Sequence, residues 1–259
     1  GQRPSVEPLF AMVSKKRIDA LLVDRKLCQS RERARALIMA GRVLVDRQPC
    51  QKAGIRFPED AAIRLKGDDH PYVSRGGLKL EAALKAYGID CTGLICLDVG
   101  ASTGGFTDCL LQHGARHVFA VDVGYGQLAW KLRQDKRVTV IERTNIRYAT
   151  PEILPVCFDF ITIDVSFISL KIVVPVTEQF LKPDGQILAL IKPQFEVGKE
   201  QVGKGGVVRD ARLHEQVISE LSRFFEEIPL VLKSVIPSPI LGPKGNREFL
   251  IHLVRSSAK

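Results

Sequence analysis

Hydrophobic residues near the beginning of the chain recur at helical spacing. Ile18, Leu21 and Leu22 fall on one side of a helix and predict a short amphipathic segment. A second helix is expected over residues 31–40, because Ser30 is a residue type that commonly caps a helix N-terminus. The pattern therefore predicts two short helices in succession.

The pattern changes from helix to strand after Gly41, since glycine is the residue type that most often follows a helix C-terminus. The apolar run Val43–Val45 predicts a strand followed by a turn, and further short strands are expected near Ile55 and over Ile63–Leu65. Two helices followed by short strands predict a small α+β domain over residues 14–67.

A different pattern begins after residues 67–71, where Gly, Asp, Asp, His and Pro break both helix and strand. We expect a linker over residues 68–73 and a second domain over residues 74–259. Strands and helices alternate in that domain, which is typical of a doubly wound, mostly parallel sheet with helices on both faces. The expected strands are 94–99, 117–123, 138–142, 159–164 and 186–191, and the expected helices between them are 105–112, 127–134 and 170–181.

The end of the chain departs from this alternation. Residues 231–237 and 249–254 flank the turn sequence GPKGN (242–246) and predict a closing antiparallel hairpin. The second domain is therefore expected to be an α/β, Rossmann-like domain with a mostly parallel seven-stranded sheet.

The charge distribution indicates a polyanionic partner for the N-terminal part of the chain. The formal net charge is +9, and residues 1–73 hold fifteen Lys or Arg against nine Asp or Glu. Most of the positive charge thus lies in little more than a quarter of the chain, an asymmetry typical of a nucleic-acid-binding module. Charge alone also fits a basic enzyme that binds no nucleic acid.

The cysteine pattern and the lack of targeting segments favour a cytoplasmic protein. The six cysteines form no CxxC pair and no His cluster accompanies them, so we expect reduced thiols and no metal site. No apolar run reaches the roughly 18 residues of a membrane-spanning helix. Residues 1–13 lack the apolar stretch of a signal peptide, and we expect them to be a flexible leader.

A glycine-rich turn predicts a ligand site in the second domain. Residues 97–106, LDVGASTGGF, read as a strand, a turn and a helix start, and match neither the dinucleotide fingerprint nor the phosphate-binding loop. Asp122, Asn145 and Asp164 follow the next three strands, whose carboxyl ends share one edge of a parallel sheet. We expect a nucleoside-bearing cofactor there, with Asp122 accepting hydrogen bonds from ribose hydroxyls. The expected turn residues are Gly100, Ala101, Ser102, Thr103, Gly104 and Gly105.

Five segments together resemble the haemolysin-A-type (TlyA) family of rRNA methyltransferases, in the family's order and from about Lys15 to Arg255. They are SRGGLKL (74–80), LDVGASTGGF (97–106), TIDVSF (162–167), LIKPQFEVGK (190–199) and NREFLIHL (246–253). The resemblance implies a class I methyltransferase domain similar to the FtsJ/RrmJ type. It also implies S-adenosyl-L-methionine as cofactor and methylation of a ribose 2′-hydroxyl of ribosomal RNA, with cytidine as the expected nucleoside.

The resemblance further implies a catalytic tetrad, which falls on Lys79, Asp164, Lys192 and Glu248. A ribose hydroxyl is a weak nucleophile, so the enzyme must align it with the methyl group and help to remove its proton. We expect Lys192 to accept that proton, since partial burial and the neighbouring cation of Lys79 favour a neutral amine. Asp164 and Glu248 are expected to hold the two lysines, and no metal is required.

The first domain resembles the RNA-binding domain named after the fourth small-subunit ribosomal protein, whose second helix and following loop present basic residues to RNA. The glycine- and proline-rich segment 193–210 is expected to be a mobile loop with Phe195 available to stack on a splayed base. Lys85 and Lys199 are the alternative tetrad lysines, and Lys199 is otherwise expected to contact phosphate. The expected RNA-binding residues are Arg17, Arg31, Arg35, Arg42, Lys52, Arg75, Phe195 and Lys199.

Two other functions are alternatives at this point. The historical name of the family suggests a membrane-active cytolysin, and the basic N-terminal domain also fits a non-catalytic ribosome-binding assembly factor. The complete tetrad and Asp122 favour the enzyme, since a pure binding protein has no need of them. Binding of S-adenosylmethionine separates the enzyme from both alternatives.

Overall fold

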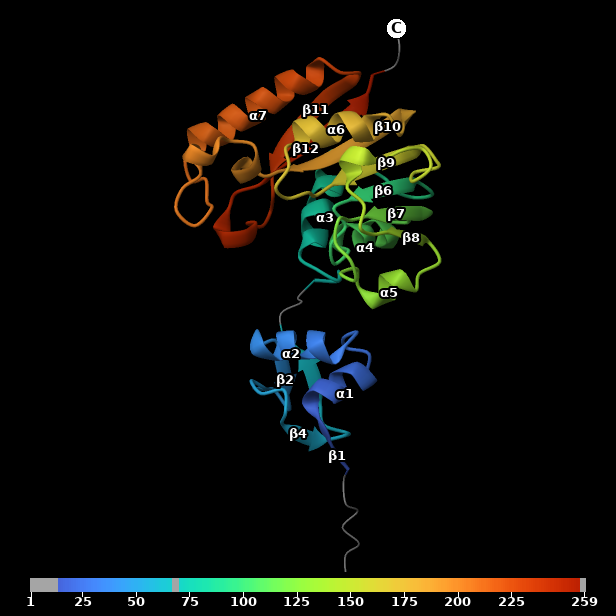
Figure 1. The fold of residues 1–259 in the computed structure, drawn as a ribbon. Helices are drawn as coiled ribbons and strands as arrows, with labels where there is room; N and C mark the ends of the chain where they lie inside the picture. Colours follow the sequence, from blue (N-terminus) through green and yellow to red (C-terminus); the bar gives the residue numbers. More distant parts are fainter. Residues whose placement is uncertain (1–13, 67–69, 257–259) are drawn as a thin grey trace, which may run out of the picture. The chain divides into compact units, whose positions relative to one another are not determined.

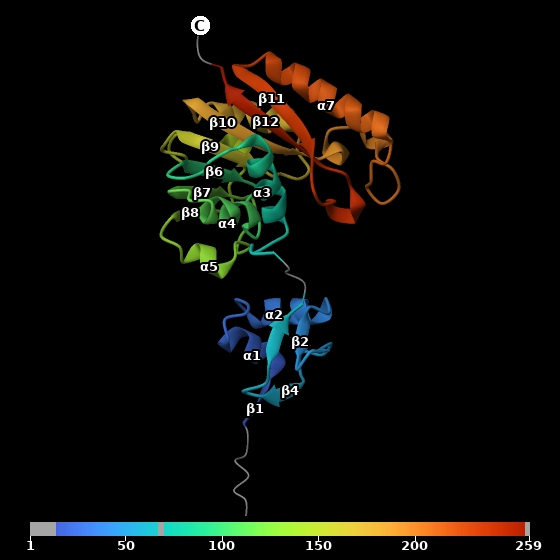
Figure 2. The same cartoon turned by 180° about the vertical axis from the view of Figure 1, so that it is seen from behind.

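The computed structural model describes residues 14–66 and 70–256. Its contacts divide the chain into two compact units, residues 1–69 and 70–259, which are drawn in Figures 1 and 2. The expected leader, residues 1–13, and residues 67–69, where the expected linker begins, lie outside the described residues.

Two helices and two small antiparallel sheets form the N-terminal unit (Figure 1). The Arg33 backbone N–H donates to the Ser30 Oγ at 3.1 Å, so Ser30 caps the second helix as the sequence predicts. Strand β2 pairs with both β3 and β5, and β1 pairs with β4. The elements are β1 (Lys15–Arg17), α1 (Ile18–Asp24), α2 (Arg31–Met39), β2 (Val43–Val45), β3 (Gln48–Pro49), β4 (Arg56–Pro58) and β5 (Ile63–Leu65).

A small apolar core holds this unit together. Ile18 and Leu22 of α1 pack with Ala34 and Ile38 of α2 and with Val43 of β2, and all five are buried. Removing apolar side chains from water is the main favourable term here. Because the apolar face of α2 packs in this core, the arginines of the helix lie on its exposed side.

A seven-stranded sheet forms the centre of the C-terminal unit, with the strand order β11-β12-β10-β9-β6-β7-β8 (Figures 1 and 2). The pairs among β10, β9, β6, β7 and β8 are parallel, whereas β12 runs antiparallel to both β10 and β11. This confirms the predicted mostly parallel sheet with its antiparallel hairpin. The strands are β6 (Ile95–Val99), β7 (His117–Val121), β8 (Val138–Ile141), β9 (Phe158–Ile163), β10 (Leu181–Ile191), β11 (Leu230–Pro237) and β12 (Phe249–Arg255).

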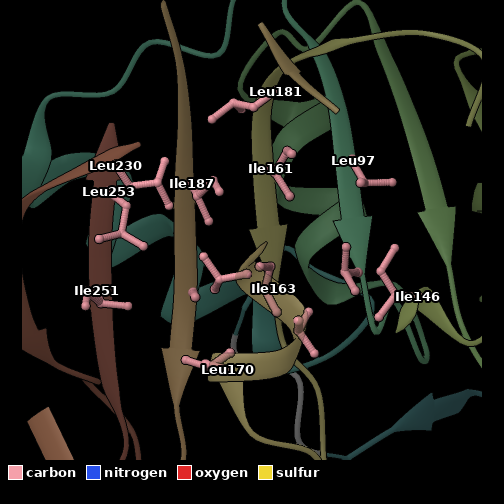
Figure 3. Packing of buried hydrophobic residues seen from close by; sticks show 14 of the residues in the cluster. Leu97, Ile146, Ile161, Ile163, Leu170, Leu181, Ile187, Leu230, Ile251 and Leu253 are labelled. Carbon is pink, nitrogen blue, oxygen red and sulfur yellow. The ribbon is translucent and has the colours of Figure 1, made fainter. Parts of the chain in front are cut away.

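Helices cover both faces of this sheet. Ile161 and Ile187 belong to the apolar cluster that includes α6 and α7, while their neighbours Phe160 and Leu188 belong to the cluster that includes α3 and α4. Figure 3 shows the first cluster, with Ile161, Ile163 and Ile187 on adjacent strands. Successive strand residues point to opposite faces, so runs without polar residues mark strands that are buried on both sides.

The helices of this unit differ from the sequence prediction in three places. The expected helix 127–134 is reduced to α5, because Ala129 is non-helical (ψ 139°) and its N–H donates to the Thr103 carbonyl instead of to the preceding turn. Helix α6 ends before Leu181, which pairs with Phe158 as the start of β10. The long helix α7 was not predicted. The helices are α3 (Gly76–Tyr87), α4 (Gly105–Gln112), α5 (Trp130–Arg133), α6 (Leu170–Glu178) and α7 (Ala211–Glu226), with 3-10 helices η1 (Ile146–Tyr148), η2 (Pro193–Phe195), η3 (Lys199–Gln201) and η4 (Pro243–Gly245).

Within residues 14–66 and 70–256, no helix has the length and apolar character that crossing a bilayer requires.

Candidate active site

The glycine-rich turn connects β6 to α4 and touches the end of β9. Gly100 has a φ of +81°, and a Cβ added there would lie 2.1 Å from the Asp164 carbonyl oxygen. At the other end of the turn, a Cβ on Gly105 would lie 2.2 Å from the Ser74 Oγ and 2.9 Å from the Gly77 backbone nitrogen. Only glycine permits both approaches, so the turn joins the end of β9 to the start of α3.

Asp122 follows β7 and is fixed against this turn. Its Oδ2 accepts a hydrogen bond from the Ser102 N–H at 2.8 Å, and its Oδ1 accepts one from the Gly124 N–H at 2.7 Å. The carboxylate is half-buried at the edge of the sheet. It therefore occupies the place where the sequence expects a ribose-binding acid.

Asn145 follows β8 but its side-chain oxygen has a local structural role. The Oδ1 accepts a hydrogen bond from the Arg147 N–H at 3.0 Å and so caps η1. Asn145 is exposed, and its expected contact with the cofactor stays a prediction.

Two ion pairs bring the four expected tetrad residues together in pairs. The Lys79 Nζ of α3 lies 2.5 Å from the Glu248 Oε2, and the Lys192 Nζ lies 2.6 Å from the Asp164 Oδ1. Lys192 also donates to the Ser166 Oγ at 3.2 Å. Lys79 and Lys192 are both 8% exposed and Glu248 is 2% exposed, so these charges are largely withdrawn from water.

The sheet register places the two pairs next to each other. In the antiparallel pairing of β10 with β12, Ile191 lies opposite Phe249, so the next residues, Lys192 and Glu248, also face each other. Directly opposed residues on adjacent strands have Cβ atoms about 5 Å apart. Lys79, Glu248, Lys192 and Asp164 therefore form one cluster across the ends of three strands and one helix.

The carboxylate of Glu248 has one oxygen left over. Its Oε2 binds Lys79, while its Oε1 is buried and makes no hydrogen bond with the described residues. A Cβ on Gly242 would lie 1.9 Å from this Oε1, so glycine at 242 makes room for it. A buried acceptor without a donor is costly, and such groups occur where a ligand supplies the missing bond.

A second buried carboxyl group, which the sequence analysis missed, lies beneath the site. Asp98 of β6 is fully buried, and it accepts hydrogen bonds from the Thr107 Oγ1 at 2.7 Å and the Thr162 Oγ1 at 3.2 Å. Burial raises the pKa of Asp98 to about 7, and the nearby charge of Asp164 adds to the increase. The available signal was Thr162 in the TIDV motif and Thr107 directly after the LDVGASTGGF segment.

An exposed aromatic ring packs on a half-buried one next to the tetrad residues. Phe167, three residues after Asp164, packs on Phe195, three residues after Lys192, with ring centroids 4.8 Å apart. Phe167 is 89% exposed and has a φ of +64°, which is strained for a bulky side chain. Phe195 was predicted from the sequence and Phe167 was not. The segment around Phe195 contains η2 and η3 where only a loop was expected.

The expected RNA-binding residues are on the surface of both units. Arg31, Arg35 and Lys52 are exposed in the N-terminal unit, and Arg75 and Lys199 are exposed in the C-terminal unit. Arg17 and Arg42 are half-buried, and the Arg42 Nε donates to the Lys66 carbonyl at 3.3 Å. Their contacts with RNA stay predictions.

Comparisons with known proteins match both units. The FtsJ-like methyltransferase family matches residues 72–255, and the S4 domain family matches residues 16–63. The 16S/23S rRNA (cytidine-2′-O)-methyltransferase TlyA of Mycobacterium tuberculosis is 46% identical over 243 residues, which cover 93% of this chain and 91% of the relative. Hemolysin A of Brachyspira hyodysenteriae is 39% identical over 254 residues, which cover 92% and 99%. A solved structure from Streptococcus thermophilus that carries the name hemolysin has a TM-score of 0.73 and 44% identity, and covers 95% of this chain and 90% of its own.

Proposed function

Because the chain belongs to the FtsJ-like methyltransferase family and carries an S4 domain, we propose that it transfers a methyl group from S-adenosyl-L-methionine to a cytidine 2′-hydroxyl of ribosomal RNA. Membership of this family confirms the resemblance that the sequence motifs indicate. The substrate is ribosomal RNA in the cytoplasm, either free or assembled in a subunit.

The observation that carries the proposal is the paired tetrad. Two buried lysines, Lys79 on α3 and Lys192 at the end of β10, are each held by a carboxylate. Buried ion pairs are a costly way to stabilise a fold, since both charges lose their hydration. Buried charged side chains at the ligand-binding edge of an α/β sheet are typical of a functional site.

The residues present fit S-adenosylmethionine at this edge. Asp122 offers a fixed carboxylate for ribose hydroxyls, and no side chain caps the N-terminus of α4, which suits a ligand carboxylate. When bound, the cofactor supplies an electrophilic methyl group. Gly100–Gly105, Asp122, Asn145 and Asp164 would hold it.

Lys192 is the residue that we assign to the ribose hydroxyl. Asp164 and Ser166 fix the position of its Nζ by accepting its N–H bonds. In the neutral amine these two bonds orient the remaining lone pair, which can then accept the proton of the hydroxyl. Lys79 stays paired with Glu248 and provides the neighbouring positive charge. The free Oε1 of Glu248 accepts a hydrogen bond from the bound nucleoside.

The surroundings of the tetrad suit a nucleotide taken out of its stack. The rings of Phe167 and Phe195 offer an exposed face for a splayed base, and Lys199 follows on the same segment for phosphate. The arginines of the S4 domain supply sequence-independent contacts with the RNA backbone.

The proposal is tested by substituting Lys192 in the full chain. Lys192→Ala should lower single-turnover methylation of ribosomal RNA by about 10²–10⁴-fold, the usual cost of losing a general base. Lys192→Arg should restore little activity, since a guanidinium does not release its proton near neutral pH. Binding of S-adenosylmethionine by calorimetry should stay normal. Lys85→Ala, which replaces an exposed lysine of α3, is the matched control.

Near-normal turnover by Lys192→Ala would contradict the assignment and leave Lys79 as the remaining base. An active Lys192→Arg variant, together with a pH–rate profile that has no limb assignable to residue 192, would show that this residue only orients the hydroxyl. Ribose methylation mapped on RNA from cells with and without the gene identifies the nucleotide. A protein that binds no S-adenosylmethionine would overturn the methyltransferase proposal altogether.

A further inference from the structure

A buried carboxylate lies at the centre of the arginines of the N-terminal unit. Asp19, the second residue of α1, has a side chain that is 0% exposed. Arg17 binds it with two hydrogen bonds of 3.0 Å, from Nε to Oδ1 and from Nη2 to Oδ2. Arg31 Nη2 and Arg35 Nε, both from α2, reach the same Oδ2 at 3.1 Å and 3.5 Å. One acid thus gathers three guanidinium groups.

Each of these arginines also remains open to solvent. The side chains of Arg17, Arg31 and Arg35 are 39%, 52% and 55% exposed. A guanidinium has five N–H donors in a rigid plane, and the bonds to Asp19 leave the Nη1 group of all three unused. Each arginine therefore has one edge fixed inside the unit and another edge available for an external acceptor.

Three like charges at this distance need a common anion to stay together. Hydrogen bonds from Arg17, and then from Arg31, hold the pKa of Asp19 well below its usual range, so the carboxylate is ionised. The cluster carries a net charge of +2 on a surface formed by β1 and α2. Ordering the long side chains in advance reduces the entropy lost when a phosphate binds them.

We propose that Asp19 is a positioning residue for RNA, which it never touches, and that it sets Arg17, Arg31 and Arg35 as a preformed receptor for backbone phosphates. This inference rests on the proposed RNA-binding role of the S4 domain. A buried acid thereby contributes to the binding of a polyanion.

Substituting Asp19 distinguishes a positioning role from a simple effect of net charge on RNA affinity. Asp19→Asn raises the net charge of the chain from +9 to +10, so long-range electrostatics alone predicts tighter binding. A positioning role of Asp19 predicts weaker RNA binding instead. We expect affinity for total bacterial ribosomal RNA in filter binding to fall by about tenfold or more near physiological salt. The slope of log affinity against log salt should decrease by about 0.7–0.9 for each phosphate that the variant no longer binds.

Asp24→Asn is the matched control. Asp24 lies on the same helix, is half exposed and pairs with the exposed Lys16, away from the three arginines. Its substitution therefore removes the same charge without disturbing the guanidinium cluster. We expect this variant to bind RNA as well as the unchanged protein or slightly better. An Asp19→Asn protein that binds as tightly as Asp24→Asn would overturn the proposal.

The double variant Arg31→Glu with Arg35→Glu separates the positioning role of Asp19 from RNA binding by the S4 domain, on which that role rests. Unchanged RNA affinity and salt slope in that protein would show that α2 does not bind RNA, and the role of Asp19 would fail with it. Weaker binding by the double variant together with normal binding by Asp19→Asn would overturn the positioning role alone. S-adenosylmethionine affinity should be unchanged in all of these proteins.

Asp19→Asn could unfold the N-terminal unit, and the thermal unfolding curve of that variant would show this. In that case, a second variant that leaves every charge in place tests the proposal. Arg31→Lys retains the cation but loses the planar fork that faces Asp19 and the solvent at once. We expect it to lose about as much RNA affinity as Arg31→Gln. Affinity equal to that of the unchanged protein would refute the preformed receptor.

Discussion

Asp98 offers a direct test of the electrostatics beneath the active site. Its carboxyl group is fully buried between α4 and β9, where the hydroxyls of Thr107 and Thr162 donate to it. Asp98→Asn removes the titratable proton and keeps the shape, and both threonine hydroxyls can also accept a bond from the new amide. The substitution should therefore change how stability depends on pH, with little change in the fold.

The size of the effect follows from the pKa of Asp98, which burial raises from 3.8 to about 7. A raised carboxyl pKa means that the folded state binds more protons than the unfolded state between these values, so stability falls as pH rises through that window. At about 1.4 kcal/mol per pKa unit, the full cost above pH 7 is up to about 4 kcal/mol. About 2–3 kcal/mol of it develops between pH 5 and pH 8.

Urea unfolding of the two proteins at pH 5 and pH 8 measures this difference. Relative to the unchanged protein, the free energy of unfolding of Asp98→Asn should be about 2–3 kcal/mol more favourable to the folded state at pH 8 than at pH 5. In thermal unfolding, this increment corresponds to about 4–12 °C for a unit of this size. An increment near zero, or one of opposite sign, would refute the assignment of a buried, neutral carboxyl group to position 98.

Three further outcomes test the site. Asp122→Ala should weaken S-adenosylmethionine binding by roughly 1.5–3 kcal/mol in calorimetry, and unchanged affinity would remove Asp122 from the cofactor site. Gly100→Ala should abolish methyl transfer because its Cβ would displace the Asp164 carbonyl, whereas Gly93→Ala, with a φ of +76° and no atom within 4 Å of its Cβ, should cost only stability. Phe167→Ala should raise the KM for RNA with cofactor affinity unchanged in equilibrium binding, and an unaltered KM would contradict base stacking.

The strands of the C-terminal unit could be predicted because burial on both faces leaves long apolar runs. The expected strand 138–142 differs from β8 (138–141) by one residue, and the expected Asp159–Asp164 differs from β9 by one at each end. Helix α7 was missed although Asp210 caps it and Val217, Leu221 and Phe225 recur at helical spacing. Its residues belong to none of the five motif segments, so only the Asp210 cap and their periodicity indicate the helix.

The motifs predicted that the four tetrad residues gather in one place, but not their contacts. The motifs indicate Lys79, Asp164, Lys192 and Glu248, but they do not say that Glu248 pairs with Lys79 of α3 and Asp164 with Lys192. The burial of Asp19 depends on arginines from two other elements, and a sequence pattern does not contain that geometry. The exposed ring at Phe167 is likewise set by a backbone conformation that its neighbours impose.

The position of β12 in the sheet makes the Lys79–Glu248 pair one of the last contacts that the chain can form during synthesis. This strand is the last of the described strands along the chain, yet it lies between β10 and β11, and Glu248 stands at its entrance. A nascent chain that has emerged only as far as β11 carries Lys79 without its partner carboxylate. Its β10 and β11 also lack the strand that joins them. We therefore expect a chain terminated before β12 to lack the Lys79–Glu248 pair that the proposed methyl transfer needs.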